Sequence, residues 1–249
     1  MRKIDRAPAR NTKASPPGWG DDQLSQFLEI AHQNRFATFH NKKFEFQRLL
    51  DIDDCFSLVG KSWNNPASLV TPMLYFRSHA AFRSACEHSM AGQIVDAFVS
   101  IRSVIETAGY AAHLNQNPDL EEIWLRRNDN EDCKNLTRKN FEISRIKKSI
   151  KSMNIGILKV FELLYERSID FGAHTNEGAI TGSMHVSETG ADKDYQFSML
   201  HSDGLPLDHA LRSVAQAGVC GLEIFGGVFS ERYDQLGLFG RLPALKRGL

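Results

Sequence analysis

The fold is decided by residues 93–115, which read QIVDAFVSIRSVIETAGYAAHLN. On a helical wheel of about 3.6 residues per turn, this stretch carries two apolar stripes and only a modest polar face. A helix that is apolar on two sides is expected at the centre of a bundle, with neighbouring helices on both sides. The first stripe consists of Ile94, Ala97, Phe98, Ile101, Val104, Ile105, Ala108 and Ala112.

Charged side chains lie within the second stripe of the same helix. Its members are Val95, Val99, Arg102, Glu106, Tyr110 and His113. We expect Arg102 and Glu106 to be partly buried, and buried charges are stable only when they are paired. Their i,i+4 spacing allows them to pair with each other. The pair is then either a bridge that fixes helix register or part of a polar pocket that binds a small molecule.

Helical periodicity continues along most of the chain. Further helices are predicted at about 21–50, 64–88, 129–152, 153–173 and 206–233, with a short one around Trp124. In the first of these, Leu24, Phe27, Leu28, Ala31 and Phe36 share one stripe. In the last, glycines such as Gly218 and Gly221 indicate close helix packing, because glycine weakens a helix and permits close approach.

Residues 179–202 follow a different pattern. Ile180, Met184 and Val186 alternate with polar residues, and so do Tyr195 and Phe197 after a glycine-containing turn. Period-2 alternation on both sides of a turn predicts a β-hairpin. We therefore expect a mainly α fold, a helical bundle of about six or seven helices with one β-hairpin inserted before the last long helix.

The composition is that of an ordinary globular protein. Of the 249 residues 42% are hydrophobic and 24% charged, which allows a substantial core. Lysine plus arginine equals aspartate plus glutamate at 30 each, so the net charge favours neither nucleic acid nor an acidic partner.

Residues 1–20 are locally basic and rich in proline, and we expect a disordered N-terminal arm there. An arm that touches RNA, DNA or anionic lipid is the alternative. Residues 21–249 are expected to form a single helical domain.

The cysteines and the apolar runs indicate in which cellular compartment the protein is expected. Four scattered cysteines with no Cys-x-x-Cys motif suit a reducing cytosol. No signal sequence opens the chain. The most apolar run, 214–229, is too short to cross a bilayer. We therefore expect a cytoplasmic location, no membrane partner and no cofactor. His185 and His201 could face each other across the hairpin, but no ligand pair on one helix turn supports a metal site.

A second candidate site lies at the end of the helix that precedes the hairpin. Arg167 and His174 are seven residues apart, close to the same face of the predicted helix. The histidine could simply cap the helix end by bonding a carbonyl. Alternatively, an arginine that holds a phosphate and a histidine that titrates near neutral pH could serve a proton transfer.

Two motifs resemble bacterial helical-bundle proteins of uncharacterised type. One helix of those proteins carries Arg-x-x-x-Glu, here Arg102 to Glu106, and a later helix ends in a pattern matched here by Tyr165, Ser168 and His174. The resemblance covers about residues 70–175. Arg102, Glu106 and Tyr165 are our candidate binding residues.

More loosely, the chain resembles the HEPN superfamily. Its ribonuclease members carry arginine, four to six residues and then histidine near a helix end, and six residues separate Arg167 from His174. The residue after that arginine is usually Asn, Asp or His, whereas here it is Ser168. The resemblance implies metal-independent RNA cleavage at a dimer interface, with RNA as a partner only in that case.

We interpret the chain first as an interaction or accessory protein whose polar clusters are structural. Its partner would be another protein or a second copy, and we expect an apolar surface patch, with the hairpin as one place for it. The HEPN-like ribonuclease that uses Arg167 and His174 is the alternative. Small-molecule binding in a polar pocket of the bundle is the second alternative.

Overall fold

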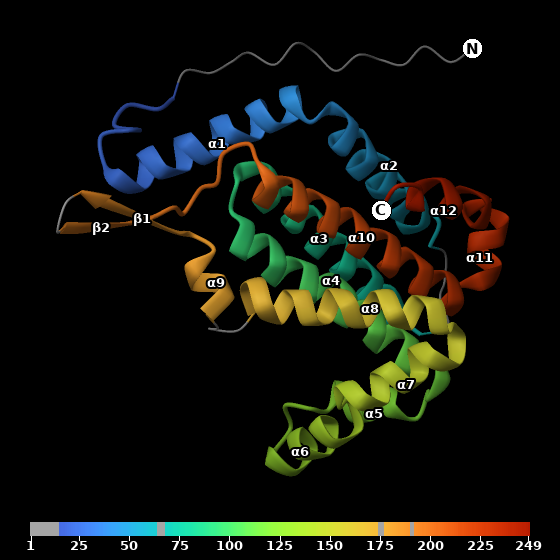
Figure 1. Ribbon diagram of the computed structural model, residues 1–249. Coiled ribbons are helices and arrows are strands. Elements are labelled where there is room, and N and C mark those ends of the chain that lie inside the picture. Colours follow the sequence, from blue (N-terminus) through green and yellow to red (C-terminus); the bar gives the residue numbers. More distant parts are fainter. Residues whose placement is uncertain (1–14, 64–67, 174–176, 190–191) are drawn as a thin grey trace, which may run out of the picture.

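The computed structural model describes residues 15–63, 68–173, 177–189 and 192–249 (Figure 1). Most of the predicted basic arm, residues 1–14, lies outside this range. The end of that segment is tied to the first helix, since Trp19 donates its indole N–H to Glu29 at 3.0 Å.

The predicted mainly α class is confirmed, and one antiparallel hairpin precedes the long helix α10 (Figure 1). Among the described residues nine helices have seven residues or more, which exceeds the predicted six or seven. The elements are α1 (Gln23–Asn41), α2 (Lys43–Gly60), α3 (Val70–Ala91), α4 (Ile94–Gln116), α5 (Leu120–Leu125), α6 (Glu131–Asn140), α7 (Ile143–Met153), α8 (Ile155–Ser168), the π-helix η1 (Ile169–Ala173), α9 (Glu177–Thr181), β1 (Met184–Thr189), β2 (Asp192–Phe197), α10 (Leu205–Val228), α11 (Ser230–Gln235) and α12 (Leu238–Lys246).

The larger number of helices arises because long predicted helices are broken. The helix predicted over 21–50 breaks at Lys42, whose dihedral angles are not helical. There its ammonium is held 2.6 Å from Asp203 and 2.7 Å from Asp208. The helix predicted over 129–152 breaks at Phe141, whose buried ring stacks on Tyr110 at a centroid distance of 5.0 Å. Contacts from distant parts of the chain thus accompany both breaks.

Helix α4 lies at the centre of the bundle, as its two apolar stripes predict. It packs against α3, α10, α7, α8 and η1. Ile101, Val104, Ile105 and Ala108 are completely buried. The glycines of α10 have the predicted packing role at Gly218, where an added Cβ would lie 2.7 Å from a methyl carbon of Ile52.

The hairpin is shorter than predicted at its beginning. Its strands pair antiparallel from Met184 with Phe197 to Thr189 with Asp192. Ile180, predicted in the first strand, belongs instead to the short helix α9. The base of the hairpin is joined to the bundle, because the backbone N–H of His201 donates to the carbonyl of Gly92 at 2.8 Å.

No helix in the described ranges combines the length and the apolar character needed to cross a membrane.

Candidate functional site

The predicted pair of Arg102 and Glu106 forms, and Tyr165 joins it from α8. Nε of Arg102 donates to Oε1 of Glu106 at 2.8 Å, and Nη2 donates to the Tyr165 hydroxyl at 3.0 Å. The guanidinium carbon also lies 4.9 Å from the centroid of the tyrosine ring. The side chains of Arg102 and Glu106 retain 21% and 34% of their exposure, so the pair is partly buried, as predicted. The cluster therefore links α4 to α8 at the border of the core.

Lys147 on α7 extends this cluster, although no sequence pattern predicted its presence there. Its ammonium lies 5.6 Å from the centroid of the Tyr165 ring and 3.6 Å from Oε1 of Glu162. The tyrosine thus has two cations near its ring, and both interactions are favourable for an aromatic π system.

The protonation states of the cluster follow from its surroundings. Burial is the largest influence on Arg102 and opposes its charge, but the hydrogen bond and charge of Glu106 outweigh it, so the pKa of Arg102 is raised. Burial raises the pKa of Tyr165, and the Arg102 charge opposes this only in part. Arg102 is therefore a cation and Tyr165 a neutral phenol at neutral pH, and each is used in binding the other.

Only Arg167 of the second predicted pair, Arg167 and His174, lies within the described residues. Arg167 donates from Nη1 to Oε1 of Gln216 on α10 at 2.9 Å. Burial lowers the pKa of Arg167, and the nearby charge of Arg212 lowers it further. His174 lies outside the described residues. The ribonuclease hypothesis, which needs both side chains in one groove, therefore stays a prediction.

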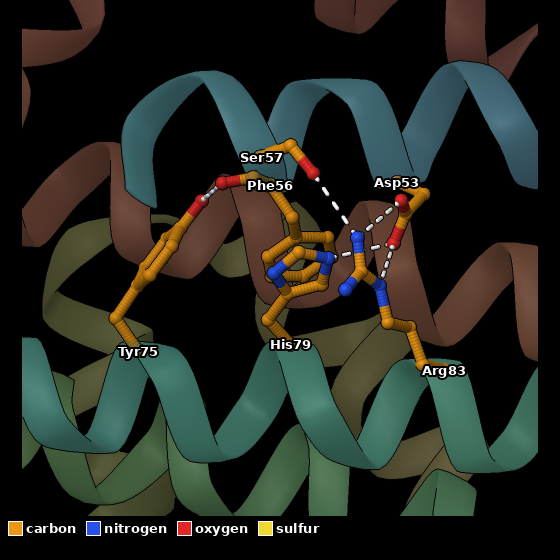
Figure 2. A network of polar contacts seen from close by, with 6 residues as sticks. All are labelled: Asp53, Phe56, Ser57, Tyr75, His79 and Arg83. Carbon is orange, nitrogen blue, oxygen red and sulfur yellow. Dashed lines mark hydrogen bonds and ion pairs between the residues drawn. The ribbon is translucent and has the colours of Figure 1, made fainter. Parts of the chain in front are cut away.

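A third polar cluster joins α2 to α3 and was missed from the sequence (Figure 2). Oδ1 of Asp53 lies 2.6 Å from Nε2 of His79 and 2.7 Å from Nε of Arg83, and Oδ2 accepts from Nη2 of Arg83 at 2.8 Å. The His79 ring stacks on Phe56 at 5.0 Å. One turn earlier on α3, Tyr75 donates its hydroxyl to the Phe56 carbonyl at 2.9 Å. The signal available was the i,i+4,i+8 spacing of Tyr75, His79 and Arg83, which places them on one helix face.

The charges of this cluster are compensated internally. Burial would raise the pKa of Asp53, but hydrogen bonds from Arg83 and His79 outweigh it and the pKa is lowered. Burial lowers the pKa of His79, and Asp53 opposes this only in part. A neutral His79 that donates Nε2–H to an ionised Asp53 fits both directions. The geometry is that of a clamp between two helices, in which both carboxylate oxygens of Asp53 are already bound.

Exposed apolar side chains gather on α1. Of the predicted apolar stripe, Ala31 is buried, whereas Leu24 and Phe36 remain 67% and 58% exposed. The reason is that α1 packs on α3 through smaller and polar side chains, with Thr38 and Asn34 hydrogen-bonded to the carbonyls of Met90 and Ala91. We call the exposed set the α1 stripe; it comprises Leu24, Leu28, Phe36 and Phe39.

The hairpin presents a second apolar face. Val186 and Tyr195 are direct cross-strand partners, and so are Met184 and Phe197. Because side chains alternate along a strand, all four lie on one face of the hairpin. All four are exposed.

The described residues contain no group of three or more His, Cys, Asp or Glu side chains able to hold a metal ion. Cys55 and Cys220 are buried free thiols, and burial raises the pKa of each. A thiol with a raised pKa is a poor nucleophile at neutral pH.

Comparison with known proteins yields no relative: no family model, no curated protein and no solved structure matches the chain.

Proposed function

We propose that this chain is an interaction protein and that it pairs with a second copy of itself through the α1 stripe. The observation that carries the proposal is the exposure of four large apolar side chains along α1. Contiguous exposed apolar surface is uncommon on a protein that works alone and is typical of association sites. The polar clusters at Arg102 and at Asp53 are structural in this proposal, because their charges are compensated within the chain.

The order of residues along α1 favours a second copy in antiparallel orientation. The centre of the stripe lies near His32, so a two-fold axis there would place Leu24 opposite Phe39 of the other copy. The same axis places Leu28 opposite Phe36. A leucine of one copy then faces a phenylalanine of the other at each of these positions, which favours close packing.

The charges at the two ends of α1 fit the same arrangement. Asp21 and Asp22 precede the helix, and Lys43 follows it; all three are exposed. About 20 residues at 1.5 Å each separate the two ends by about 30 Å. In antiparallel pairing Asp21 therefore meets Lys43 of the second copy. An interface of one helix per chain is at the low end of stable interfaces, about 1,200 Å² in total, so we expect association in the micromolar range.

Sedimentation velocity over a concentration series tests the proposal. The wild-type chain should sediment as a dimer at tens of micromolar and dissociate on dilution. The double variant Leu28→Ser, Phe36→Ser should bind itself at least about tenfold more weakly, since it removes two apolar contacts from each copy. Leu125→Ser is the matched control, because Leu125 is similarly exposed but lies on α5.

All three chains should retain the same circular dichroism, since none of the substituted side chains is buried. A wild-type chain that stays monomeric at tens of micromolar overturns the proposal. The same holds for a double variant that associates as tightly as the Leu125 control.

A further inference from the structure

A cavity of about 280 Å³ lies where the base of the hairpin meets α4, η1 and the start of α10. Phe98, Phe171 and Leu205 form apolar walls, and Ser183, His201 and His209 supply its polar groups. At about 30 Å³ for each water molecule, the space would hold about nine waters, or an organic molecule of about ten non-hydrogen atoms. Its volume lies just below the range of about 300–1,000 Å³ that is usual for small-ligand sites, and its lining, apolar with a few polar groups, is of that kind.

The walls of the cavity are built by close packing. The rings of Phe98 and Phe171 are 5.2 Å apart, and each lies within 5.6 Å of the His209 ring. Gly172 allows this arrangement, because a Cβ there would lie 2.9 Å from Cβ of Phe98 and would also collide with the carbonyl of Val95. The π-helix η1 thus holds Phe171 against α4. Such single-turn π-helices recur at functional sites.

Two arginines, Arg167 and Arg212, lie outside the cavity lining but close to His209. His209, Arg212 and Gln216 follow one another at i, i+3 and i+7 and share one face of α10. Arg167 reaches that face from α8 through its hydrogen bond to Gln216 at 2.9 Å.

The two arginines have no carboxylate partner within ion-pair distance among the described residues. Asp208 is the acid one turn before Arg212, but it is bound by Lys42 at 2.7 Å. Burial lowers the pKa of His209, and the charges of Arg167 and Arg212 lower it further. Within the described part of the chain, Arg167 is therefore a partly buried cation without a carboxylate in ion-pair contact, close to His209 and Arg212, and an anion bound there would compensate its charge.

We propose that this cavity binds a small monocarboxylate with an aromatic or branched aliphatic body. The body fills the space between Phe98, Phe171 and Leu205. In this proposal the carboxylate lies beyond His209, on the face of α10 that carries Arg212 and that Arg167 contacts through Gln216. A planar guanidinium binds a carboxylate with two parallel hydrogen bonds, which suits this class of ligand.

Isothermal titration calorimetry on the full chain tests this with three probes. 3-Phenylpropionate carries both the ring and the charge, 3-phenylpropanamide has the ring alone, and acetate has the charge alone. The acid should bind saturably with one molecule per chain. The amide should bind at least about tenfold more weakly, because a hydrogen bond to a charged group is worth more than one to a neutral group. Acetate should bind at least as weakly as the amide.

Variants separate the two halves of the site. Arg212→Gln should remove most of the preference for 3-phenylpropionate over its amide. Leu205→Glu should lower the affinity for 3-phenylpropionate, because it places a second negative charge at the cavity. Leu205 is 84% exposed and Arg212 is also exposed, so neither change removes core packing. Arg138→Gln, at an exposed arginine on α6, is the matched control and should bind like the wild type.

Absence of saturable binding by 3-phenylpropionate overturns the proposal. Equal affinity for acid and amide overturns it as well, and so does an Arg212→Gln variant that keeps the wild-type preference.

Discussion

His79 and Asp53 are joined across α2 and α3, with Nε2 of the imidazole 2.6 Å from Oδ1 of the carboxylate. The same carboxylate accepts two hydrogen bonds from Arg83. One acidic side chain therefore satisfies donors on two residues of the facing helix.

Asp53→Ala should lower the free energy of unfolding by about 1–3 kcal/mol, because a buried N–H of His79 then loses its partner. Urea unfolding at neutral pH measures the change. Asp54→Ala is the matched control, since its neighbouring carboxylate is exposed and should shift stability by less than about 0.5 kcal/mol. Equal effects of the two substitutions would show that the contacts of Asp53 with His79 and Arg83 add nothing to the free energy of unfolding.

His113 should make stability dependent on pH. Its Nδ1 lies 2.8 Å from the Ser149 hydroxyl and its Nε2 lies 3.0 Å from the Asn140 carbonyl. Burial lowers its pKa below the ordinary value of 6.5, against the opposing effect of the Asn140 carbonyl. The neutral ring fits these contacts, with Nε2–H donating to the carbonyl and Nδ1 accepting from the hydroxyl.

The sign follows from a pKa that is lower in the folded chain than in the unfolded chain. Below about pH 6.5 the unfolded chain binds more protons, so stability is full above that value and falls as the pH falls through the folded pKa. Urea unfolding at pH 7.5 and 5.5 measures how much free energy of unfolding is lost between the two pH values. This loss should be smaller for His113→Gln than for the wild type. An identical loss in both chains would rule out His113 as a source of the pH dependence.

Tyr165→Phe should separate the hydroxyl from the ring. The variant keeps the stacking on Phe161, at a centroid distance of 6.0 Å, and loses the acceptor for Nη2 of Arg102. We expect a loss of about 0.5–1.5 kcal/mol in the free energy of unfolding. Tyr195→Phe on the exposed face of the hairpin is the control and should have no measurable effect. If Tyr165→Phe also leaves the free energy of unfolding unchanged, the hydroxyl does not stabilise the contact between α4 and α8.

Two glycines in helices should respond to alanine in opposite directions. An added Cβ at Gly218 would lie 2.5 Å from the Phe82 ring and 2.7 Å from Ile52. Gly218→Ala should therefore destabilise the chain by about 1–3 kcal/mol through overpacking. At Gly240 in α12 no atom lies within 4 Å of the added carbon. Gly240→Ala should then stabilise by about 0.4–1 kcal/mol, because alanine favours the helix. Thermal unfolding distinguishes the two, and a destabilised Gly240 variant would contradict the packing described for α12.

Local pattern was sufficient wherever a contact lies within one helix. The two apolar stripes of α4 predicted its central place, and the i,i+4 spacing of Arg102 and Glu106 predicted their ion pair. Tyr165 is 63 residues from Arg102, so helical spacing alone could not bring it there. The contact between Asp53 and His79 could not be predicted for the same reason, since the two residues belong to different helices.

The α1 stripe shows a different limit. Periodicity identifies an apolar face but does not say which surface covers it. In the structure α1 turns its smaller side chains toward α3 and leaves Leu24 and Phe36 exposed.

Charge reversal tests the antiparallel pairing of α1 independently of the apolar stripe. Lys43→Asp should weaken dimerisation about tenfold, because it places like charges opposite each other at both ends of the symmetric interface. Adding Asp21→Lys to that variant should restore the affinity, since the pair is then reversed but again complementary. Lys61→Asp, at an exposed lysine beyond the end of α2, is the control for the change in net charge. High salt should reduce the difference between the chains, because it screens exposed pairs. A double variant as weak as Lys43→Asp alone would exclude the antiparallel arrangement, even if the α1 stripe is the interface.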